Sequence, residues 1–536
     1  MSESQRPSRI TLIAAAVFIS LTAFLLWAHG NRLVLNNDEG IILDASVRML
    51  HGQTLYRDFF GIMTPGSYWI QEAAFALFGI SIRSGRIVVI LDFAVQCAVV
   101  FWLTALLAGK KMAFAATIIF AAFQTSSPDR PDFLLAQHRM DSAAFALLSI
   151  ALCVQGQRCA KAWYWAAGGL LIPAATLCTP TVGLIAAATL VWLYASRSLR
   201  RYFLPYCVGL VAATVASLAF LTGTGVLKQL VEQIGWLSRN YPTVNYMPYG
   251  SVFGGYGNVL AGTAGLELLI HALIVFCVAL PAVLPITAIV AWTWAMFDSR
   301  MTAQSRQILK TPIPYLLGCM AVLVIGTYPR SDVIHLAFVA ALPYVLTATW
   351  ISWYSPRSIA AAVGIVFGIL AIAFVANTAN HIRAEVGVAT PVGTVRVLPA
   401  NLDGVQKLLG CVRPGDTLFV HPYRPILYFL TQSHNPTRYS YVQPGLMTSD
   451  DEAATLRDLK NMPPKAVLYL QLERAEYLRV WPNASNLNHR FPDIEDWIAR
   501  EYIPVEPPVS LSGYRLYLRA PRTADPASRS CTTEVQ

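Results

Sequence analysis

Long apolar runs recur between residues 10 and 378 of this chain, and they restrict it to membrane-protein folds. A helix needs about 20 apolar residues to cross the hydrocarbon core of a bilayer. Hydrophobic residues make up 55% of the 536-residue chain and charged residues only 13%, which excludes the soluble globular classes. We expect eleven spans, at residues 10–28, 87–108, 112–124, 142–155, 162–177, 180–195, 203–222, 266–296, 312–327, 335–353 and 358–378.

The first run could be read as a signal peptide, but it has no clean small-residue cleavage site and further spans follow, so we expect it to be retained. With a cytoplasmic N-terminus, the inside segments contain 13 Lys and Arg residues and two acids, Glu3 and Asp298. Basic residues concentrate in cytoplasmic loops, which supports this orientation. An odd number of spans places the C-terminus outside. We therefore expect a multi-pass protein of the cytoplasmic (inner) membrane whose C-terminal domain is extracytoplasmic (periplasmic).

The net charge of +10 reflects this loop pattern. Because the basic residues are dispersed over separate loops and form no single patch, we expect no nucleic-acid partner.

The chain changes character near residue 380, where apolar runs shorten to strand length and Pro, Asp and Arg become frequent. We expect a transmembrane domain at 1–379 and an extracytoplasmic α/β domain at 380–536. The expected strands are Thr417–Val420, Ala466–Leu470 and Arg515–Leu518, and the expected helices are Pro425–Thr431 and Ile494–Glu501.

The nine cysteines show no CxxC motif and no metal-ligand spacing. Seven lie in or beside the spans, where small apolar packing residues are the ordinary interpretation. Cys411 and Cys531 are the pair in the exported domain, and a disulfide between them is expected, because such bonds persist outside the cytosol.

An acidic pair, Asp38-Glu39, follows the first span by about ten residues, on the outside. Two amphipathic helices are expected in the same loop, at 38–51 and 65–79, lying in the membrane interface. They would hold the pair at headgroup depth, where a carboxylate can act as a catalytic base. The alternative is structural: an acid near a helix start commonly serves as a cap.

Further charged residues lie in later outside loops. His138, Arg139 and Asp141 precede the fourth span, where ion pairing is the structural alternative. A short loop between the ninth and tenth spans carries Arg330 and Asp332, followed by His335. A guanidinium at this depth suits bidentate phosphate recognition, although interfacial snorkelling would also explain it.

These residues together resemble the GT-C superfamily of membrane glycosyltransferases, most nearly bacterial lipid A aminoarabinose transferases and protein O-mannosyltransferases. The resemblance rests on Asp38-Glu39, on Asp141, and on a helix with Pro65-Gly66-Ser67-Tyr68-Trp69 and Leu77-Phe78-Gly79 followed by Arg86. The segment from Tyr428 to Arg438 also looks like the C-terminal domains of such bacterial enzymes. One departure is Met63-Thr64, where aminoarabinose transferases carry a Lys, so the same donor sugar does not follow.

The resemblance implies transfer of a sugar from a polyprenyl-phosphate donor to a hydroxyl of a lipid, glycan or protein, with inversion. The implied catalytic residues are Asp38, Glu39 and Asp141. The donor phosphate would be held by Arg330, Arg86, Arg83 and His335. The remaining substrate contacts would come from Tyr68, Trp69, His138, Arg139 and Asp332. The chemistry requires no cofactor, and a divalent metal held by Asp38, Glu39 and Asp141 stays an alternative.

Two other classes of function compete with a transferase. A transporter or flippase of a lipid-linked sugar would place ionisable residues near the bilayer midplane, whereas these carboxylates gather in outside loops. A non-catalytic cell-envelope assembly subunit would bind glycan and tolerate loss of Asp38.

Overall fold

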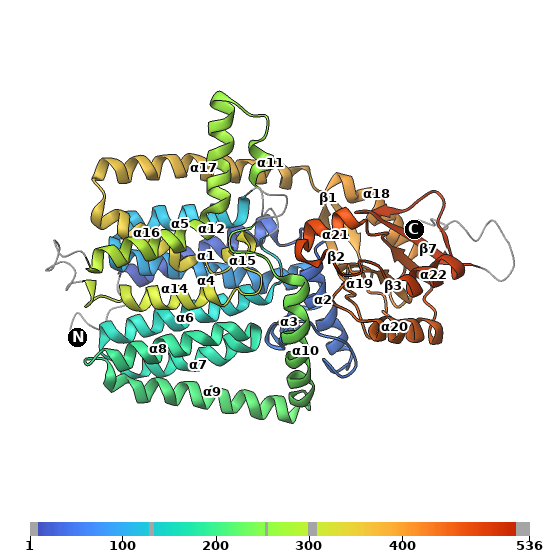
Figure 1. Cartoon of the computed structure of the whole chain (residues 1–536), viewed down its shortest axis with the longest axis horizontal. Coiled ribbons are helices and arrows are strands. Elements are labelled where there is room, and N and C mark those ends of the chain that lie inside the picture. Colours follow the sequence, from blue (N-terminus) through green and yellow to red (C-terminus); the bar gives the residue numbers. More distant parts are fainter. Residues whose placement is uncertain (1–8, 128–132, 252–255, 298–307, 521–536) are drawn as a thin grey trace.

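Each expected span overlaps a helix in the computed structural model, which describes residues 9–127, 133–251, 256–297 and 308–520. The helices are α1 (Arg9–His29), α4 (Ile82–Ala108), α5 (Lys110–Ser126), α6 (His138–Cys159), α7 (Ala162–Cys178), α8 (Leu184–Ala195), α9 (Phe203–Gly223), α12 (Gly265–Phe297), α14 (Ile313–Ile325), α16 (Ala341–Tyr354) and α17 (Arg357–Ala384). Most of them run side by side, with the C-terminal part at one end (Figure 1).

Within the described ranges, six helices are long and apolar enough to cross a membrane, namely α1, α4, α6, α9, α12 and α17. The other five have 12–17 residues and are shorter than a full crossing. The expected polytopic α-helical membrane protein is confirmed. The number of eleven crossings stays a prediction.

The helix bundle is held by close contacts between small residues and by buried aromatic rings. A Cβ atom on Gly209 of α9 would lie 1.9 Å from the carbonyl oxygen of Ala166 on α7, so only glycine permits this approach. Phe93 and Phe120 stack with ring centroids 5.7 Å apart between α4 and α5. The helices that carry the outside loops are thereby fixed relative to one another.

Among the described residues, five helices outside this bundle lie in the extracytoplasmic loops of the proposed topology. They are α2 (Asn37–Leu50), α3 (Gly66–Phe78), α10 (Leu227–Asn245), α11 (Tyr256–Leu260) and α15 (Val333–Ala337). The first two correspond to the helices expected at 38–51 and 65–79. In Figure 1, α2, α3 and α10 lie between the bundle and the C-terminal part.

The C-terminal part is an α/β structure, as expected. Its elements are β1 (Val386–Thr390), β2 (Gly393–Val397), α18 (Pro399–Cys411), β3 (Leu418–His421), α19 (Ile426–Thr431), α20 (Ser449–Asn461), β4 (Ala466–Tyr469), α21 (Arg474–Val480), η5 (Pro482–Ala484), α22 (Pro492–Glu501), β5 (Tyr502–Pro504), β6 (Ser510–Leu511) and β7 (Tyr514–Arg519). One sheet has the order β3-β4-β7-β5, with β6 also paired to β7, and β1 and β2 form a separate hairpin. Only the β3–β4 pairing is parallel in these sheets of the described chain.

The C-terminal part packs directly on α2. A Cβ atom on Gly40 would lie 2.1 Å from the backbone nitrogen of Ile426, so α2 and α19 approach as closely as their backbones allow. The rings of Phe75 on α3 and Phe429 on α19 stack at 5.6 Å. Because Asp38 lies at the start of α2, this contact also sets the position of that carboxylate.

Cys411 is disulfide-bonded, and Cys531, its expected partner, lies outside the described residues. The other seven cysteines are free thiols.

Candidate active site

The start of α2 presents Asp38 without using it as a cap. The side-chain oxygen of Asn36 accepts hydrogen bonds from the backbone N–H groups of Asp38 (2.8 Å) and Glu39 (3.2 Å). Asn36 is therefore the N-cap, which that residue type favours. The half-buried Asp38 carboxylate accepts a hydrogen bond from Gln137 at 3.3 Å. The structural alternative, in which the Asp38 side chain caps the helix, is therefore not observed.

Glu39 points elsewhere, although it is the next residue. Its side chain is fully buried and forms an ion pair with Arg86, with Nε and Oε1 2.9 Å apart. Arg86 also donates to the backbone carbonyls of Arg32 (3.1 Å) and Leu134. Arg86 is therefore a buried partner of Glu39 that ties α2 to α4 and to the segment before α6.

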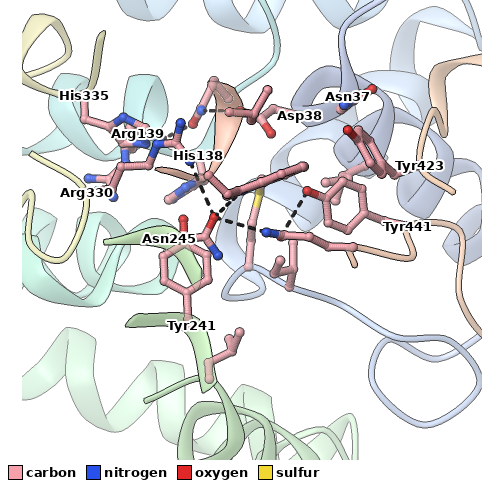
Figure 2. A pocket seen from close by; sticks show the side chains of 18 of the residues that line it. Asn37, Asp38, His138, Arg139, Tyr241, Asn245, Arg330, His335, Tyr423 and Tyr441 are labelled. Atoms are coloured by element: carbon pink, nitrogen blue, oxygen red, sulfur yellow. Dashed lines mark hydrogen bonds between the residues drawn. The ribbon is translucent and has the colours of Figure 1, made fainter. Parts of the chain in front are cut away.

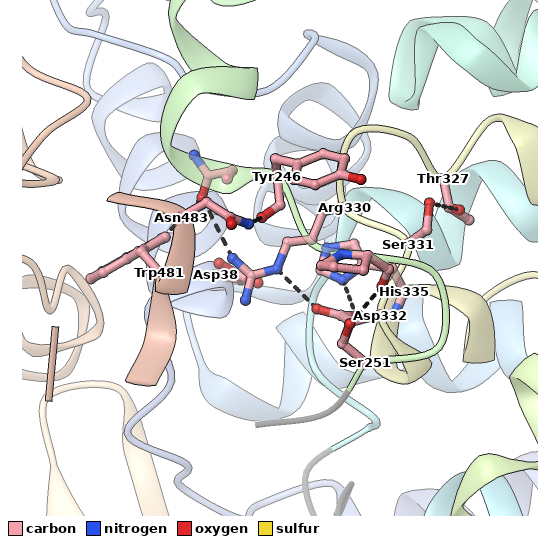
Figure 3. Close-up of polar contacts among 12 residues, drawn as sticks. Asp38, Tyr246, Ser251, Thr327, Arg330, Ser331, Asp332, His335, Trp481 and Asn483 are labelled. Atoms are coloured by element: carbon pink, nitrogen blue, oxygen red, sulfur yellow. Dashed lines mark hydrogen bonds and ion pairs between the residues drawn. The ribbon is translucent and has the colours of Figure 1, made fainter. Parts of the chain in front are cut away.

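Arg330 lies in the short loop before α15, in a polar cluster with Asp332 and His335 (Figure 3). Its Nε atom is 3.0 Å from Asp332, whose other oxygen is 2.7 Å from Nδ1 of His335. Burial would raise the pKa of Asp332, but the neighbouring His335 and Arg330 lower it to about 2. The carboxylate is charged at neutral pH and holds the Arg330 guanidinium in place.

His138 and Arg139 begin α6, beside Gln137, which contacts Asp38. His138 contacts the hydroxyl of Thr179 through Nδ1 at 2.9 Å. The Nε atom of Arg139 has no hydrogen-bond partner among the described residues, although it is shielded from solvent. A buried guanidinium with an unpaired N–H donor can bind an anion.

A cavity of about 1020 Å³ brings these groups together. Figure 2 shows Asp38 on the same side as Asn37, Tyr423 and Tyr441, with Arg139, Arg330 and His335 across from them. Among the residues that the structure describes, the charged groups lining it are four arginines and two acids, namely Arg139, Arg330, Arg424, Arg479, Asp38 and Glu476. The excess of positive charge suits a phosphate group.

The C-terminal part supplies much of the opposite wall. Tyr423, Tyr441 and Trp481 line the cavity, and Tyr423 packs edge-on against Trp481 with ring centroids 5.4 Å apart. Burial raises the pKa of Tyr441 well above its usual value, and burial also raises the pKa of Tyr241. Both phenols are therefore neutral at physiological pH. The Tyr241 hydroxyl can donate a hydrogen bond to a ligand, whereas that of Tyr441 already donates to the side-chain oxygen of Gln443 at 3.2 Å.

Several residues predicted from the sequence lie outside this cavity. Asp141 is buried beside Asp92 and Ser67, and it does not line the cavity. Tyr68 is fully buried, and its hydroxyl accepts a hydrogen bond from the backbone N–H of Met63 at 3.4 Å. Trp69 packs against Phe220. Asp332 does not line the cavity itself but forms an ion pair with Arg330, which does. The predicted residues absent from the lining are Glu39, Tyr68, Trp69, Arg83, Arg86, Asp141 and Asp332.

The three carboxylates suggested for a metal do not form one site. Asp38 faces the cavity, whereas Glu39 is paired with Arg86 and Asp141 lies elsewhere. Across the described ranges, no group of three or more His, Cys, Asp and Glu side chains is arranged to hold a metal ion.

Sequence reasoning missed the residues that reach the cavity from distant segments. Tyr241 and Asn245 lie on α10, which has an amphipathic pattern with Leu230, Ile234 and Leu237 on one side. That periodicity could have identified the helix. No local signal marks Tyr423, Tyr441, Gln443 or Trp481 as cavity residues, because only the packing of the C-terminal part brings them there.

Comparison with known proteins connects this geometry to a fold. A family model described as dolichyl-phosphate-mannose-protein mannosyltransferase matches residues 63–220. No curated protein matches the sequence significantly. ArnT from Cupriavidus metallidurans bound to undecaprenyl phosphate superposes with a TM-score of 0.56 at 12% identity, covering 96% of this chain and 99% of that one. The oligosaccharyltransferase of Archaeoglobus fulgidus in complex with Zn and sulfate superposes with a TM-score of 0.52 at 13% identity, covering 95% and 73%.

Both of these proteins are GT-C glycosyltransferases. The chain has a GT-C fold. The GT-C resemblance inferred from the sequence is thereby confirmed. Within this GT-C fold the family match includes α6, with His138 and Arg139, but neither Asp38 nor Arg330. The roles of the latter two rest on geometry.

Proposed function

We propose that this GT-C chain is a polyprenyl-phosphate-dependent glycosyltransferase, hexosyl or pentosyl, that moves a sugar to an acceptor hydroxyl with inversion. One observation carries the proposal: the carboxylate of Asp38 shares a cavity with the guanidinium groups of Arg139 and Arg330. A base and two cations are what the reaction needs at its two ends. ArnT, which has a similar fold, binds undecaprenyl phosphate in its solved structure, which supports a lipid phosphate as the donor's carrier.

The reaction forms one bond and breaks one. The acceptor oxygen attacks the anomeric carbon from the face opposite the phosphate, and the bond between that carbon and the phosphate oxygen breaks. Asp38 takes the acceptor's proton as the new glycosidic bond forms. The electron pair leaves with the polyprenyl phosphate, whose developing charge is stabilised by Arg139 and Arg330. No cofactor is needed for these steps.

The acceptor is a hydroxyl of a lipid, glycan or protein. The reaction takes place at the outer face of the cytoplasmic membrane, because the basic loops indicate a cytoplasmic N-terminus. Asp38, Arg139 and Arg330 line the same cavity as residues of the C-terminal part, which the same topology places outside.

A turnover assay tests the proposal. Purified protein in lipid nanodiscs is incubated with a panel of polyprenyl-phosphate hexoses and pentoses, together with lipid, glycan and peptide acceptors. The expected result is release of polyprenyl phosphate and an inverted glycoside with at least one combination. A parallel reaction with EDTA should retain its rate. Absence of turnover across the panel, with a well-folded protein that binds polyprenyl phosphate, would favour a transporter or assembly role.

A further inference from the structure

The side-chain oxygen of Asn245, the last residue of α10, is crowded with donors. It accepts hydrogen bonds from Trp481 Nε1 (3.0 Å), Gln443 Nε2 (3.3 Å) and a terminal nitrogen of Arg330 (3.5 Å). Trp481 and Gln443 belong to the C-terminal part, and Arg330 belongs to the loop before α15. One amide oxygen thus joins three segments that are distant in the sequence.

These contacts also determine the positions of the oxygen and the nitrogen of the Asn245 amide. Three N–H donors converge on a single atom, and an NH₂ group at that place would meet them with repulsion. The atom is therefore the oxygen. In Figure 2 the hydrogen bonds of Asn245 are all drawn to it.

The nitrogen of the same amide is left without a partner among the described residues, although Asn245 is only 4% exposed and lines the cavity. A buried N–H donor with no acceptor destabilises the protein, so such a group is normally satisfied. A ligand oxygen in the cavity would satisfy it.

The segment after Asn245 is rigidly attached to the Arg330 loop. The backbone N–H of Met247 donates to the carbonyl of Pro329 at 3.0 Å, and that of Ser331 donates to the carbonyl of Met247 at 3.2 Å. Asn483 on η5 donates to the carbonyl of Tyr246 at 2.6 Å, which attaches the C-terminal part to the same segment (Figure 3). Asn245 therefore cannot turn away without disturbing Arg330.

We propose that Asn245 is a specificity-determining residue of the cavity, and that its amide nitrogen donates a hydrogen bond to an oxygen of the sugar-phosphate headgroup of the donor. Its oxygen fixes the positions of Arg330, Gln443 and Trp481 relative to one another. The headgroup is therefore recognised only when the C-terminal part is packed against α10 and the Arg330 loop. This inference rests on the proposed function for the chemical class of the ligand. The relevant oxygen belongs either to the phosphate or to a sugar hydroxyl.

The variant Asn245→Asp tests the role of the amide nitrogen separately from that of the amide oxygen. Aspartate keeps an oxygen facing the three donors but puts a second oxygen, in place of the N–H donor, where the ligand oxygen would lie. The thermal unfolding temperature should stay near that of the wild type. Binding of the headgroup should weaken about 10-fold to 100-fold, because a hydrogen bond is replaced by repulsion between oxygens. Asn486→Asp is the matched control, since the same change is made at an exposed side chain outside the cavity.

The binding of two ligands to protein in nanodiscs is compared. The first is polyprenyl phosphate. The second is the polyprenyl-phosphate sugar that gives turnover in the panel assay, or a polyprenyl-phosphate hexose if none does. Weaker binding of both by Asn245→Asp places the nitrogen on the phosphate, and weaker binding of the sugar-charged lipid alone places it on a sugar hydroxyl. Unchanged binding of both, or equal loss in Asn486→Asp, overturns the inference. If the wild-type protein binds both lipids but shows no turnover, the proposed reaction is contradicted. The effect of Asn245→Asp on lipid binding still tests the role of Asn245 in that case. Wild-type protein that binds neither overturns both.

Discussion

Asn36 caps the helix on which Asp38 lies, through a hydrogen bond of 2.8 Å from the Asp38 backbone N–H to the Asn36 side chain. The carboxylate of Asp38 has no capping duty and remains available for the cavity. Asp38→Asn should leave folding intact and reduce turnover by about 10²–10⁴, the usual contribution of a general base. Single-turnover rates with saturating donor measure this. Near-normal turnover would remove Asp38 from the mechanism.

Glu39→Gln provides the contrasting variant on the adjacent residue. It leaves the Arg86 guanidinium buried beside a neutral group, and loss of one partner of a buried ion pair costs about 3–5 kcal/mol. We expect a lower unfolding temperature for Glu39→Gln and no such change for Asp38→Asn. Equal stability of the two variants would contradict the division of roles between the neighbouring acids.

Arg330→Lys should impair donor binding nearly as much as Arg330→Ala. A lysine cannot contact Asp332 and Asn245 at once while presenting a planar fork to a phosphate. The donor KM of both variants should rise by about tenfold or more, since a charge-assisted contact contributes about 1.5–3 kcal/mol. Arg83→Lys, at an exposed site outside the cavity, is the control. A wild-type KM in Arg330→Ala would make Arg330 an interfacial anchor only.

Gly40→Ala should loosen the contact between α2 and the C-terminal part. The added methyl group would meet the Ile426 backbone, which cannot move aside as a side chain does. Overpacking of this kind costs about 1–3 kcal/mol, so the unfolding temperature and the turnover should both fall. Gly364→Ala, on α17 with open space around the added atom, should be tolerated. Equal behaviour of the two variants would contradict the close approach.

Asp44 on α2 should make stability depend on pH. Burial raises its pKa to about 6, although Arg48 and a hydrogen bond with Ser440 lower it. The folded state therefore binds a proton more tightly than the unfolded state, whose pKa is near 3.8. This contribution to stability is complete below about pH 4 and is lost as the pH rises through about 6.

Asp44→Asn removes that dependence and should stabilise the protein at pH 7 by up to about 3 kcal/mol. Unfolding temperatures measured between pH 4 and 8 test it, with Asp450→Asn at an exposed carboxyl as the control. A pH profile identical to that of the wild type would contradict the prediction.

The orientation can be tested by a fusion after residue 536. A reporter that is active only outside the cytosol should be active there, because 13 basic residues and only two acids lie on the proposed inside segments. Activity of a cytosol-only reporter at this position would contradict both the topology and the proposed outer-face reaction.

The helices and the central strands could be predicted because their signals are local. Apolar runs mark spans, and β3, β4 and β7 lie within a residue or two of the strands expected at Thr417–Val420, Ala466–Leu470 and Arg515–Leu518. The grouping of side chains was harder to predict. Asp38 and Glu39 are adjacent in the sequence, but successive helix positions point about 100° apart, so one faces the cavity and the other is buried.

The polar residues Arg139, Arg330 and His335 were predicted because charge at the end of an apolar span is conspicuous. Asn245 and Trp481 were not predicted, because neither belongs to a motif. Their part in the cavity depends on contacts between α10, the Arg330 loop and the C-terminal part. Such contacts join positions more than 80 residues apart and leave no pattern in a single sequence.

The apolar residues of α2 and α19 share one buried cluster, in which Ile42 and Leu43 lie with Ile426 and Tyr428. The expected boundary near residue 380 therefore crosses one continuous apolar core, because residues on both sides of it belong to the same buried cluster. A chain truncated there would expose half of a hydrophobic core and lose one wall of its cavity. Exchange of the C-terminal part for that of another protein would require α2 to change with it.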